Sequence, residues 1–146
     1  MDLEVWLDIK VIIIAGGLGT RISEETDDKP KPMVLINGQP ILWHLMNIFS
    51  LQGFNDFVIS TGYKSEVIEK WVSKNKILDS NFEKMNIDTL DTGLHTQTGG
   101  RISEVMKVLP NERVIATYGD GLANVSIEKL LDFHARHGKL ATVTAV

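Results

Sequence analysis

The sequence contains no cysteine. Disulfide bonds, thiol nucleophiles and zinc sites with thiolate ligands are therefore excluded, and the composition fits a reducing compartment, so we expect a cytoplasmic location. An excess of basic residues is also lacking, because 15 Lys and Arg are outnumbered by 19 Asp and Glu. Nucleic acids and anionic membranes usually require a basic face on their partners, so we expect neither as a partner.

Long apolar runs are missing as well. The longest, Val11 to Ala15, is far shorter than the roughly 20 residues that a membrane-spanning helix needs. The first ten residues, MDLEVWLDIK, are acidic where a signal peptide would be basic. We therefore expect neither export nor membrane insertion, and a chain of 146 residues suffices for one compact domain or part of one.

Segments with strand character and segments with helix character alternate along the chain. Strands are predicted at Lys10–Ala15, Phe57–Thr61, Arg113–Tyr118 and Leu140–Val146, and MNIDTL at residues 85–90 suggests a further strand. Helices are predicted from Pro40 to Gly53, from a cap at Ser65 to about Lys74, from about Ile102 to Leu109, and from a cap at Ser126 to His137, where Gly138 ends the helix. Strands joined by helices of this length predict an α/β fold with a mainly parallel, Rossmann-like sheet flanked by helices.

The segment VIIIAGGLGTRISEETDDKPKPMV, residues 11–34, places three glycines and an arginine directly after the first predicted strand. It matches neither a P-loop nor a dinucleotide fingerprint, in which Ile22 would have to be glycine. Glycines nevertheless let backbone N–H groups approach an anion, Thr20 can donate a hydroxyl hydrogen bond, and Arg21 can fork around phosphate oxygens. The loop is predicted to bind phosphate, and the alternative is an ordinary glycine turn with a surface arginine.

Two further segments are expected to lie beside this loop. Pro30 and Pro32 bracket Lys31 and predict a stiff, extended segment that cannot be helical, which would hold a cation in place for phosphoryl transfer. Asp120 lies in a Gly-Asp-Gly turn after a predicted strand, and the carboxyl ends of parallel strands meet at one edge of a sheet. The alternatives are a solvated surface lysine and a simple turn aspartate.

The residues AGGLGTR and KPKPM together resemble the signature of sugar-1-phosphate nucleotidyltransferases. PILWH at residues 40–44, DTGLHTQTGGR at 91–101 and TYGDG at 117–121 are similar to the cytidylyl-transferring branch of that family. The resemblance implies transfer of a cytidylyl group from CTP to glucose 1-phosphate, with Mg²⁺ as cofactor. It also implies that residues 1–146 are the N-terminal, nucleotide-binding part of a nucleotidyltransferase domain.

The resemblance also assigns roles to individual residues. It implies that Arg21, Lys31 and Asp120 are catalytic, with Lys31 neutralising charge where the two phosphates meet and Asp120 holding Mg²⁺. The nucleotide would be bound by two groups of residues, Gly16, Gly17, Gly19, Thr20 and Arg21 in the first loop and Thr96, Thr98, Gly99, Gly100 and Arg101 in the second.

Family members are longer, so the resemblance implies a C-terminal truncation, with a second metal-binding aspartate and much of the sugar pocket outside this chain. The stretch between Trp71 and Asp91 is shorter than in typical cytidylyltransferases, where it contributes to subunit contacts, and a homo-oligomer is expected for the full-length protein. Alternatives are a non-catalytic nucleotide- or sugar-phosphate-binding fragment and a nucleotidyltransferase that uses another nucleotide. A dinucleotide-dependent oxidoreductase is disfavoured by Ile22.

Overall fold

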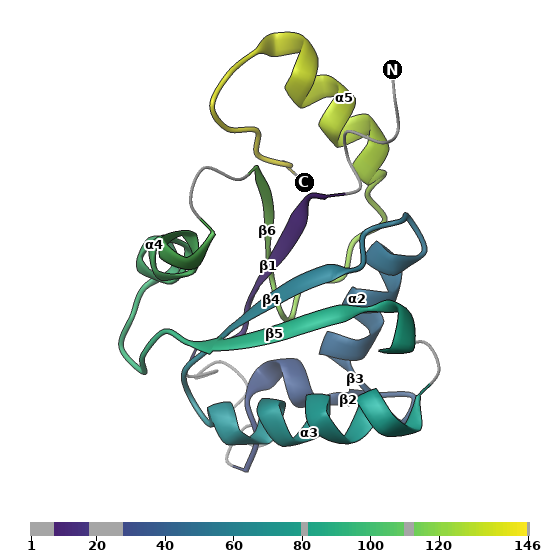
Figure 1. Cartoon of the computed structure of the whole chain (residues 1–146), viewed down its shortest axis with the longest axis vertical. Helices are drawn as coiled ribbons and strands as arrows, with labels where there is room; N and C mark the ends of the chain where they lie inside the picture. Colours follow the sequence, from purple (N-terminus) through teal and green to yellow (C-terminus); the bar gives the residue numbers. More distant parts are fainter. Residues whose placement is uncertain (1–7, 18–27, 80–81, 110–112, 146) are drawn as a thin grey trace.

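The computed structural model describes residues 8–17, 28–79, 82–109 and 113–145. Its centre is a four-stranded sheet in the order β5-β4-β1-β6 (Figure 1). All three pairs of neighbouring strands are parallel. The strands are β1 (Lys10–Ile14), β4 (Asp56–Thr61), β5 (Asn86–Asp91) and β6 (Val114–Tyr118). The predicted α/β fold with a mainly parallel sheet is confirmed.

Within the described residues, three helices and several short elements connect these strands, and a fourth helix follows β6. The helices are α2 (Ile41–Ser50), α3 (Ser65–Leu78), α4 (Thr98–Val108) and α5 (Ile127–His137). Two 3₁₀ turns, η2 (Lys31–Met33) and η3 (Phe82–Lys84), and a hairpin of β2 (Leu35–Ile36) and β3 (Gln39–Pro40) complete the described part. The hairpin was not predicted, although Asn37-Gly38 at its tip, both with positive φ, is a strong hairpin signal.

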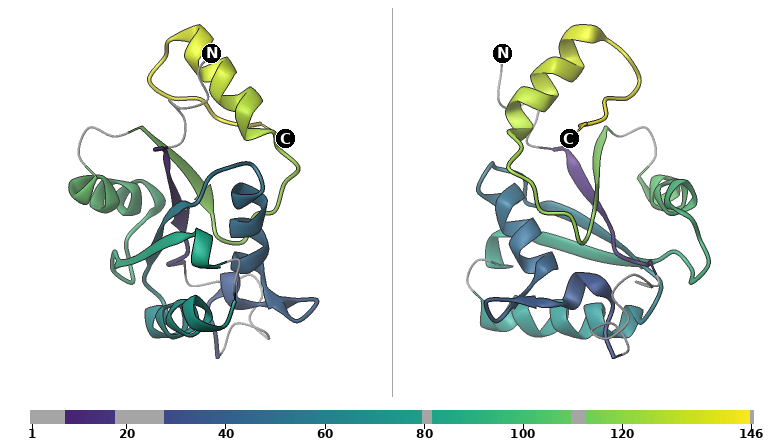
Figure 2. Two further views of the ribbon diagram at one scale, coloured as in Figure 1. Left: turned by 45° about the vertical axis from the view of Figure 1, so that its right-hand side comes forward. Right: turned by 180° about the vertical axis from the view of Figure 1, so that it is seen from behind.

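The sheet is covered by helices on both faces, as Figure 2 shows. Val11 and Ile13 of β1 face the larger core, where α2, α3 and α5 pack, while Ile12 faces a smaller core under α4. All three side chains are fully buried. This explains why β1 is a continuous β-branched run, since a central parallel strand buries both of its faces.

The chain order of the strands places the site. From β1 the chain crosses to β4 and β5 on one side, and after α4 it returns to β6 on the other side of β1. Ligands of open α/β sheets bind at such a switch point, outside the carboxyl ends of the strands. β6 forms one edge of this sheet and pairs only with β1 among the described strands.

Several predicted boundaries are confirmed and others are wrong. Ser126 caps α5 as predicted, its Oγ accepting from the Lys129 N–H at 3.3 Å. Ser65 is the first residue of α3 rather than its cap, and α3 runs on to Leu78. Helix α4 starts at Thr98, one turn before the predicted Ile102, because its two glycines do not prevent a first turn.

The predicted strand at Leu140–Val146 is absent from the described residues 140–145. Leu140 and Val143 are almost fully exposed. A strand is stabilised by hydrogen bonds to a neighbouring strand, and none of these residues pairs with the sheet. The β-branched pattern alone was therefore an insufficient basis for the prediction. Within the described part of the chain, no helix is long and apolar enough to cross a membrane.

Candidate functional site

A pocket of about 270 Å³ lies where β1 and β6 end, at the switch point of the sheet. Its walls come from the end of β1, the η2 turn, the loop before α4 with the start of that helix, and the end of β6. The lining residues are Ile14, Ala15, Gly17, Lys31, Pro32, Thr96, Gln97, Thr98, Arg101, Tyr118 and Asp120. The expected meeting of the end of β1, Lys31 and the turn that holds Asp120 at one edge of the sheet is confirmed.

Lys31 and Asp120 form an ion pair within this pocket. Lys31 Nζ lies 2.6 Å from Asp120 Oδ2, and the two side chains are 28% and 30% exposed. A charged pair that solvent still reaches gains less than a buried one and remains available to other charged groups. The sequence therefore identified two side chains that the fold brings into direct contact, 89 positions apart in the chain.

The backbone at Lys31 differs from the prediction of an extended segment. Lys31 opens the 3₁₀ turn η2, whose Met33 N–H donates to the Pro30 carbonyl at 2.8 Å. Proline is compatible with the first residues of a helical turn, because their N–H groups need no partner within the turn. The turn is anchored by the buried side chain of Met33. The position of Lys31 is thus fixed by a turn that is anchored in the core, and not by an extended segment.

Gly119 allows the η2 turn to approach the end of β6. A Cβ atom at this position would lie 3.0 Å from Pro32 Cγ, tighter than ordinary carbon contacts. The Gly119 N–H also donates to the Ile14 carbonyl at 2.9 Å, which fixes the start of the Gly119-Asp120 turn against β1. The glycine before Asp120 is therefore explained by packing, and this packing brings Asp120 within reach of Lys31.

Arg101 lies on the opposite wall of the pocket and is 3% exposed. Its guanidinium donates to the carbonyl oxygens of Gly16 and Thr61, at 2.8 Å each. Burial lowers the pKa of Arg101 below its ordinary value, and the Asp91 carboxylate partly opposes this effect. Arginine nevertheless stays protonated at neutral pH. Its predicted role as a nucleotide ligand remains a prediction, since its observed bonds are to the protein itself.

The remaining predicted residues divide into three groups. Gly17, Thr96 and Thr98 line the pocket. Gly99 and Gly100 are exposed in the first turn of α4 and do not contribute to the lining, and Gly16 lies behind it, against Arg101. Gly19, Thr20 and Arg21 lie outside the described residues.

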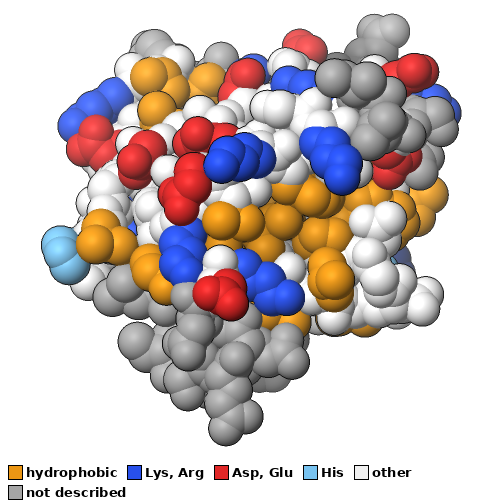
Figure 3. All heavy atoms as spheres, turned by 90° about the horizontal axis from the view of Figure 1, so that it is seen from below, with side chains coloured by type: hydrophobic (Ala, Val, Ile, Leu, Met, Phe, Trp, Pro, Cys, Tyr) orange, Lys and Arg blue, Asp and Glu red, His pale blue; other side chains and the backbone are white. Residues whose placement is uncertain are grey.

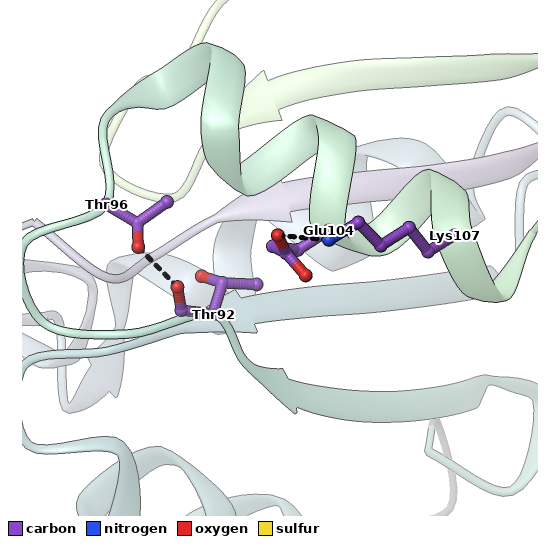
Figure 4. Close-up of polar contacts among 4 residues, drawn as sticks. All are labelled: Thr92, Thr96, Glu104 and Lys107. Atoms are coloured by element: carbon purple, nitrogen blue, oxygen red, sulfur yellow. Dashed lines mark hydrogen bonds and ion pairs between the residues drawn. The ribbon is translucent and has the colours of Figure 1, made fainter.

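Thr96 has a structural contact that its predicted role did not anticipate. Its Oγ1 donates to the Thr92 carbonyl at 2.5 Å, which closes the loop between β5 and α4 (Figure 4). The Asp91 carboxylate accepts from the Gly93 N–H at 2.9 Å in the same loop. These local bonds give the loop a defined shape at the pocket wall.

Sequence reasoning missed Gln97 and Tyr118, which also line the pocket. Gln97 is the N-cap residue of α4, and Tyr118 is half-exposed at the end of β6. Both were adjacent to predicted motif residues. The sequence signal that could have identified them is this adjacency, since Gln97 lies between Thr96 and Thr98, and Tyr118 directly precedes the Gly119-Asp120 turn.

The charge distribution and donor set bear on which ligands the pocket accepts. Seen from below, the molecule shows basic and acidic side chains side by side, with no broad area of one sign (Figure 3). Among the described residues, no three His, Asp or Glu side chains cluster in a way that could hold a metal by themselves. One carboxylate, Asp120, lines the pocket. This donor set suits Mg²⁺, which proteins often bind through one or two carboxylates together with substrate phosphates.

Comparison with known proteins assigns the chain to a family. The family model described as nucleotidyl transferase matches residues 10–146, so this chain belongs to the nucleotidyl transferase family. Within it, the chain is 43% identical to the glucose-1-phosphate cytidylyltransferase of Salmonella typhimurium, over 94% of this chain and 60% of that protein. It is 34% identical to the D-glycero-alpha-D-manno-heptose 1-phosphate guanylyltransferase of Campylobacter jejuni, over 84% of this chain and 52% of that protein.

A solved structure supports the same fold. HddC from Yersinia pseudotuberculosis, in complex with GMP-PN, matches with a TM-score of 0.72 and 31% identity, over 86% of this chain and 54% of that chain. The predicted resemblance and the Rossmann-like fold are therefore confirmed. The chain spans between about half and 60% of the length of these relatives.

Proposed function

We propose that this chain is the nucleotide-binding part of a glucose-1-phosphate cytidylyltransferase. A phosphate oxygen of glucose 1-phosphate attacks the α-phosphorus of CTP, the bond from that phosphorus to the β-phosphate oxygen breaks, and CDP-glucose and pyrophosphate form. The observation that carries the proposal is the contact of Lys31 with Asp120 in one pocket beside the glycine-rich end of β1. The identity of 43% to the Salmonella enzyme supports the choice of substrates.

The residues of the pocket suit phosphoryl transfer, in which the protein mainly positions groups and stabilises charge. Lys31 supplies a positive charge on a turn that is anchored in the core, and so balances negative charge where the two phosphates meet. Gly17 leaves the end of β1 open for close approach of phosphate, since beyond its chain neighbours no atom of the described residues lies within 4 Å of the position its Cβ would take. Arg21 and Thr20 complete the predicted phosphate-binding group.

Mg²⁺ would be held by Asp120 together with substrate phosphates, and when bound it would neutralise phosphate charge and orient the leaving pyrophosphate. The rest of the reaction depends on residues of this chain. Lys31 holds the phosphates, the glycine-rich loop orients them, and the walls formed by Gln97 and Tyr118 border the space where the nucleotide lies. We also propose a cytoplasmic location, which the absence of cysteine supports, and a homo-oligomer for the full-length protein.

A second candidate is a guanylyltransferase. The Campylobacter guanylyltransferase aligns over 122 residues, which cover 84% of this chain. This alignment therefore contains few insertions relative to this chain. The alignment with the Salmonella cytidylyltransferase spans 154 residues, more than this whole chain of 146. That relative therefore carries residues that this chain lacks, in line with the shorter stretch predicted between Trp71 and Asp91. The nucleotide remains the feature to test first.

Base choice is tested by calorimetric titration of the chain with CTP, UTP, dTTP, GTP and ATP in the presence of Mg²⁺. CTP is expected to bind most tightly, because a site that hydrogen-bonds cytosine leaves buried polar groups unpaired when another base enters. Tightest binding of GTP would favour the guanylyltransferase, and equal affinity for all five nucleotides would contradict both candidates. A Lys129→Ala variant serves as the control for non-specific charge effects, because Lys129 is an exposed residue of α5.

Turnover is tested by following pyrophosphate release from CTP, Mg²⁺ and glucose 1-phosphate. In the described residues the pocket is lined by a single carboxylate, so we expect binding of CTP without multiple turnovers by this chain. Precise positioning of the attacking group can be worth roughly 7 to 11 kcal/mol of the barrier. Turnover at ordinary enzyme rates would contradict this expectation, and no binding of CTP would contradict the proposed function itself.

A further inference from the structure

The guanidinium of Arg101 lies at the meeting point of three strand ends. Its Nη2 donates to the Gly16 carbonyl at 2.8 Å, just after β1, and to the Leu94 carbonyl at 3.4 Å, in the loop after β5. Its Nη1 donates to the carbonyl of Thr61, the last residue of β4, at 2.8 Å, and to Thr92 Oγ1, just after β5, at 2.7 Å. One side chain from α4 thus connects three neighbouring strand ends of the sheet.

The hydroxyl groups around Arg101 have only one consistent arrangement. Thr92 Oγ1 donates to the Thr61 carbonyl at 2.9 Å and accepts from Arg101 Nη1, so its single hydrogen is used. The hydrogen bond of 2.8 Å between Ser60 Oγ and Thr92 Oγ1 must therefore be donated by Ser60. All four Nη hydrogens of Arg101 have acceptors. A lysine, with three hydrogens on one nitrogen, cannot reproduce this forked pattern.

The backbone around the guanidinium leaves no space for side chains. A Cβ atom at Gly16 would lie 2.0 Å from Arg101 Nη1, and one at Gly62 would lie 2.7 Å from the same atom. The packing of the protein itself therefore requires glycine at both positions, since a Cβ would also lie 2.8 Å from the Thr61 carbonyl at Gly16 and 2.8 Å from the Gly93 carbonyl at Gly62. The guanidinium, the glycines and the hydroxyl network form a single packed unit at the pocket wall, where Arg101 is itself a lining residue.

We propose that Arg101 is a positioning residue, which locks the end of β1 to the ends of β4 and β5 and so fixes the two pocket walls that carry Gly17 and Thr96. It acts through the carbonyl groups of Gly16, Thr61 and Leu94, to which its guanidinium donates. The consequence for ligand binding rests on the proposed function, because the nucleotide is the ligand whose phosphates these walls would receive.

A fixed wall matters because the glycine-rich end of β1 has no side chains to hold its shape. The Gly16 carbonyl accepts from Arg101 and also from the Tyr63 N–H, at 3.2 Å. Without the arginine, the latter is the one remaining described hydrogen bond on that carbonyl. Backbone N–H groups bind an anion well only when they are already oriented before it arrives, since ordering them on binding reduces affinity. Arg101 supplies that order in the free protein.

The proposal is tested with Arg101→Lys, which keeps the positive charge and removes the forked guanidinium that donates from two nitrogens. A matched control, Thr92→Val, removes one buried acceptor of Arg101 and leaves the bonds to Gly16 and Thr61 in place. For both variants, thermal stability, amide hydrogen exchange in the ligand-free protein, and calorimetric affinity for CTP and for inorganic tripolyphosphate are measured. The amide of Tyr63 is the reporter, because it donates to the Gly16 carbonyl.

In Arg101→Lys we expect faster exchange at Tyr63 and weaker binding of both ligands, each by about tenfold, which corresponds to one or two hydrogen bonds. In Thr92→Val we expect exchange at Tyr63 and both affinities to change by no more than about threefold, despite a similar loss of stability. Tripolyphosphate has no base, so its response isolates the phosphate-binding end of β1.

Two outcomes would overturn the proposal. If affinity falls in both variants in proportion to stability, Arg101 is an ordinary structural residue. If Arg101→Lys loses affinity while exchange at Tyr63 is unchanged, Arg101 contacts the ligand directly. Failure of the wild-type chain to bind CTP or tripolyphosphate would contradict the proposed function instead, and the exchange measurement would still decide whether Arg101 locks the strand ends.

Discussion

The two sides of the pocket are built on different kinds of cation. On one side, the guanidinium of Arg101 is 3% exposed and has four protein acceptors. On the other side, the ammonium of Lys31 pairs with Asp120 within the described part of the chain, and the two side chains are about a third exposed. Hydrogen bonds hold the first cation in place, and a solvent-accessible ion pair holds the second.

The difference matters for binding. A buried charge with fully used donors is costly to rearrange, because any lost partner leaves an unpaired group out of water. A partly exposed ion pair costs little to open, since water replaces each partner. The Arg101 side of the pocket is therefore suited to keeping its shape, and the Lys31 side to exchanging partners when an anion arrives. Three substitutions test this comparison.

The largest effect is expected from Lys31→Ala, measured in a form of the protein that turns over substrate. Removing a positioned charge from the transition state should lower kcat by about 100-fold or more, with a smaller effect on KM. Steady-state kinetics with CTP and glucose 1-phosphate provide the measurement, and Lys129→Ala on α5 is the control. A rise in KM with unchanged kcat would make Lys31 a residue that binds the ground state only.

The next effect is expected from Gly16→Ala, which tests how rigid the Arg101 side is. The new methyl group would overlap the guanidinium and also approach the Thr61 carbonyl at 2.8 Å, so we expect the free energy of unfolding to fall by about 2 kcal/mol or more. Chemical denaturation measures this change. Gly17→Ala is the matched control, because, chain neighbours aside, its Cβ would meet no atom of the described residues within 4 Å. Equal stability of the two variants would show that this side adapts easily.

The smallest effect is expected from Lys107→Ala on α4. Lys107 Nζ lies 2.6 Å from Glu104 Oε1, in an ion pair whose side chains are 64% and 44% exposed (Figure 4). Exposed pairs of this spacing contribute about 0.5 kcal/mol or less, so stability and nucleotide affinity should hardly change. A loss of more than about 1 kcal/mol would show that exposed ion pairs matter more here than their solvent screening suggests.

Much of the fold could be predicted because its signals are local. The β-branched run of β1, the cap at Ser126 and the glycine that ends α5 each act within a few residues, and each is found in the structure. The strand predicted at residues 140–146 failed because pairing is not local. The same limit applies to α3, whose polar C-terminal part gave too weak a periodicity to show where the helix ends.

The site could be predicted in part. Topology alone placed Lys31 and Asp120 at one edge of the sheet, and the structure brings them into contact. The burial of Arg101 was not predicted, because a charged residue is expected on a helix surface. Its spacing was the available signal, since Arg101 precedes the buried Val105 by four residues and so shares the inward face of α4. The number of carbonyl groups around it depends on three strand ends, which no local pattern reveals.

The position of β6 at the edge of the sheet has a consequence for handling the protein. The strand at the other edge, β5, carries two aspartates, whereas β6 has the uncharged sequence VIATY. Charged side chains on edge strands discourage pairing with a second molecule, and an uncharged edge lacks that protection. In the described part of the chain nothing pairs with the outer side of β6. We therefore expect concentrated solutions of this polypeptide to undergo intermolecular strand pairing that begins at this edge.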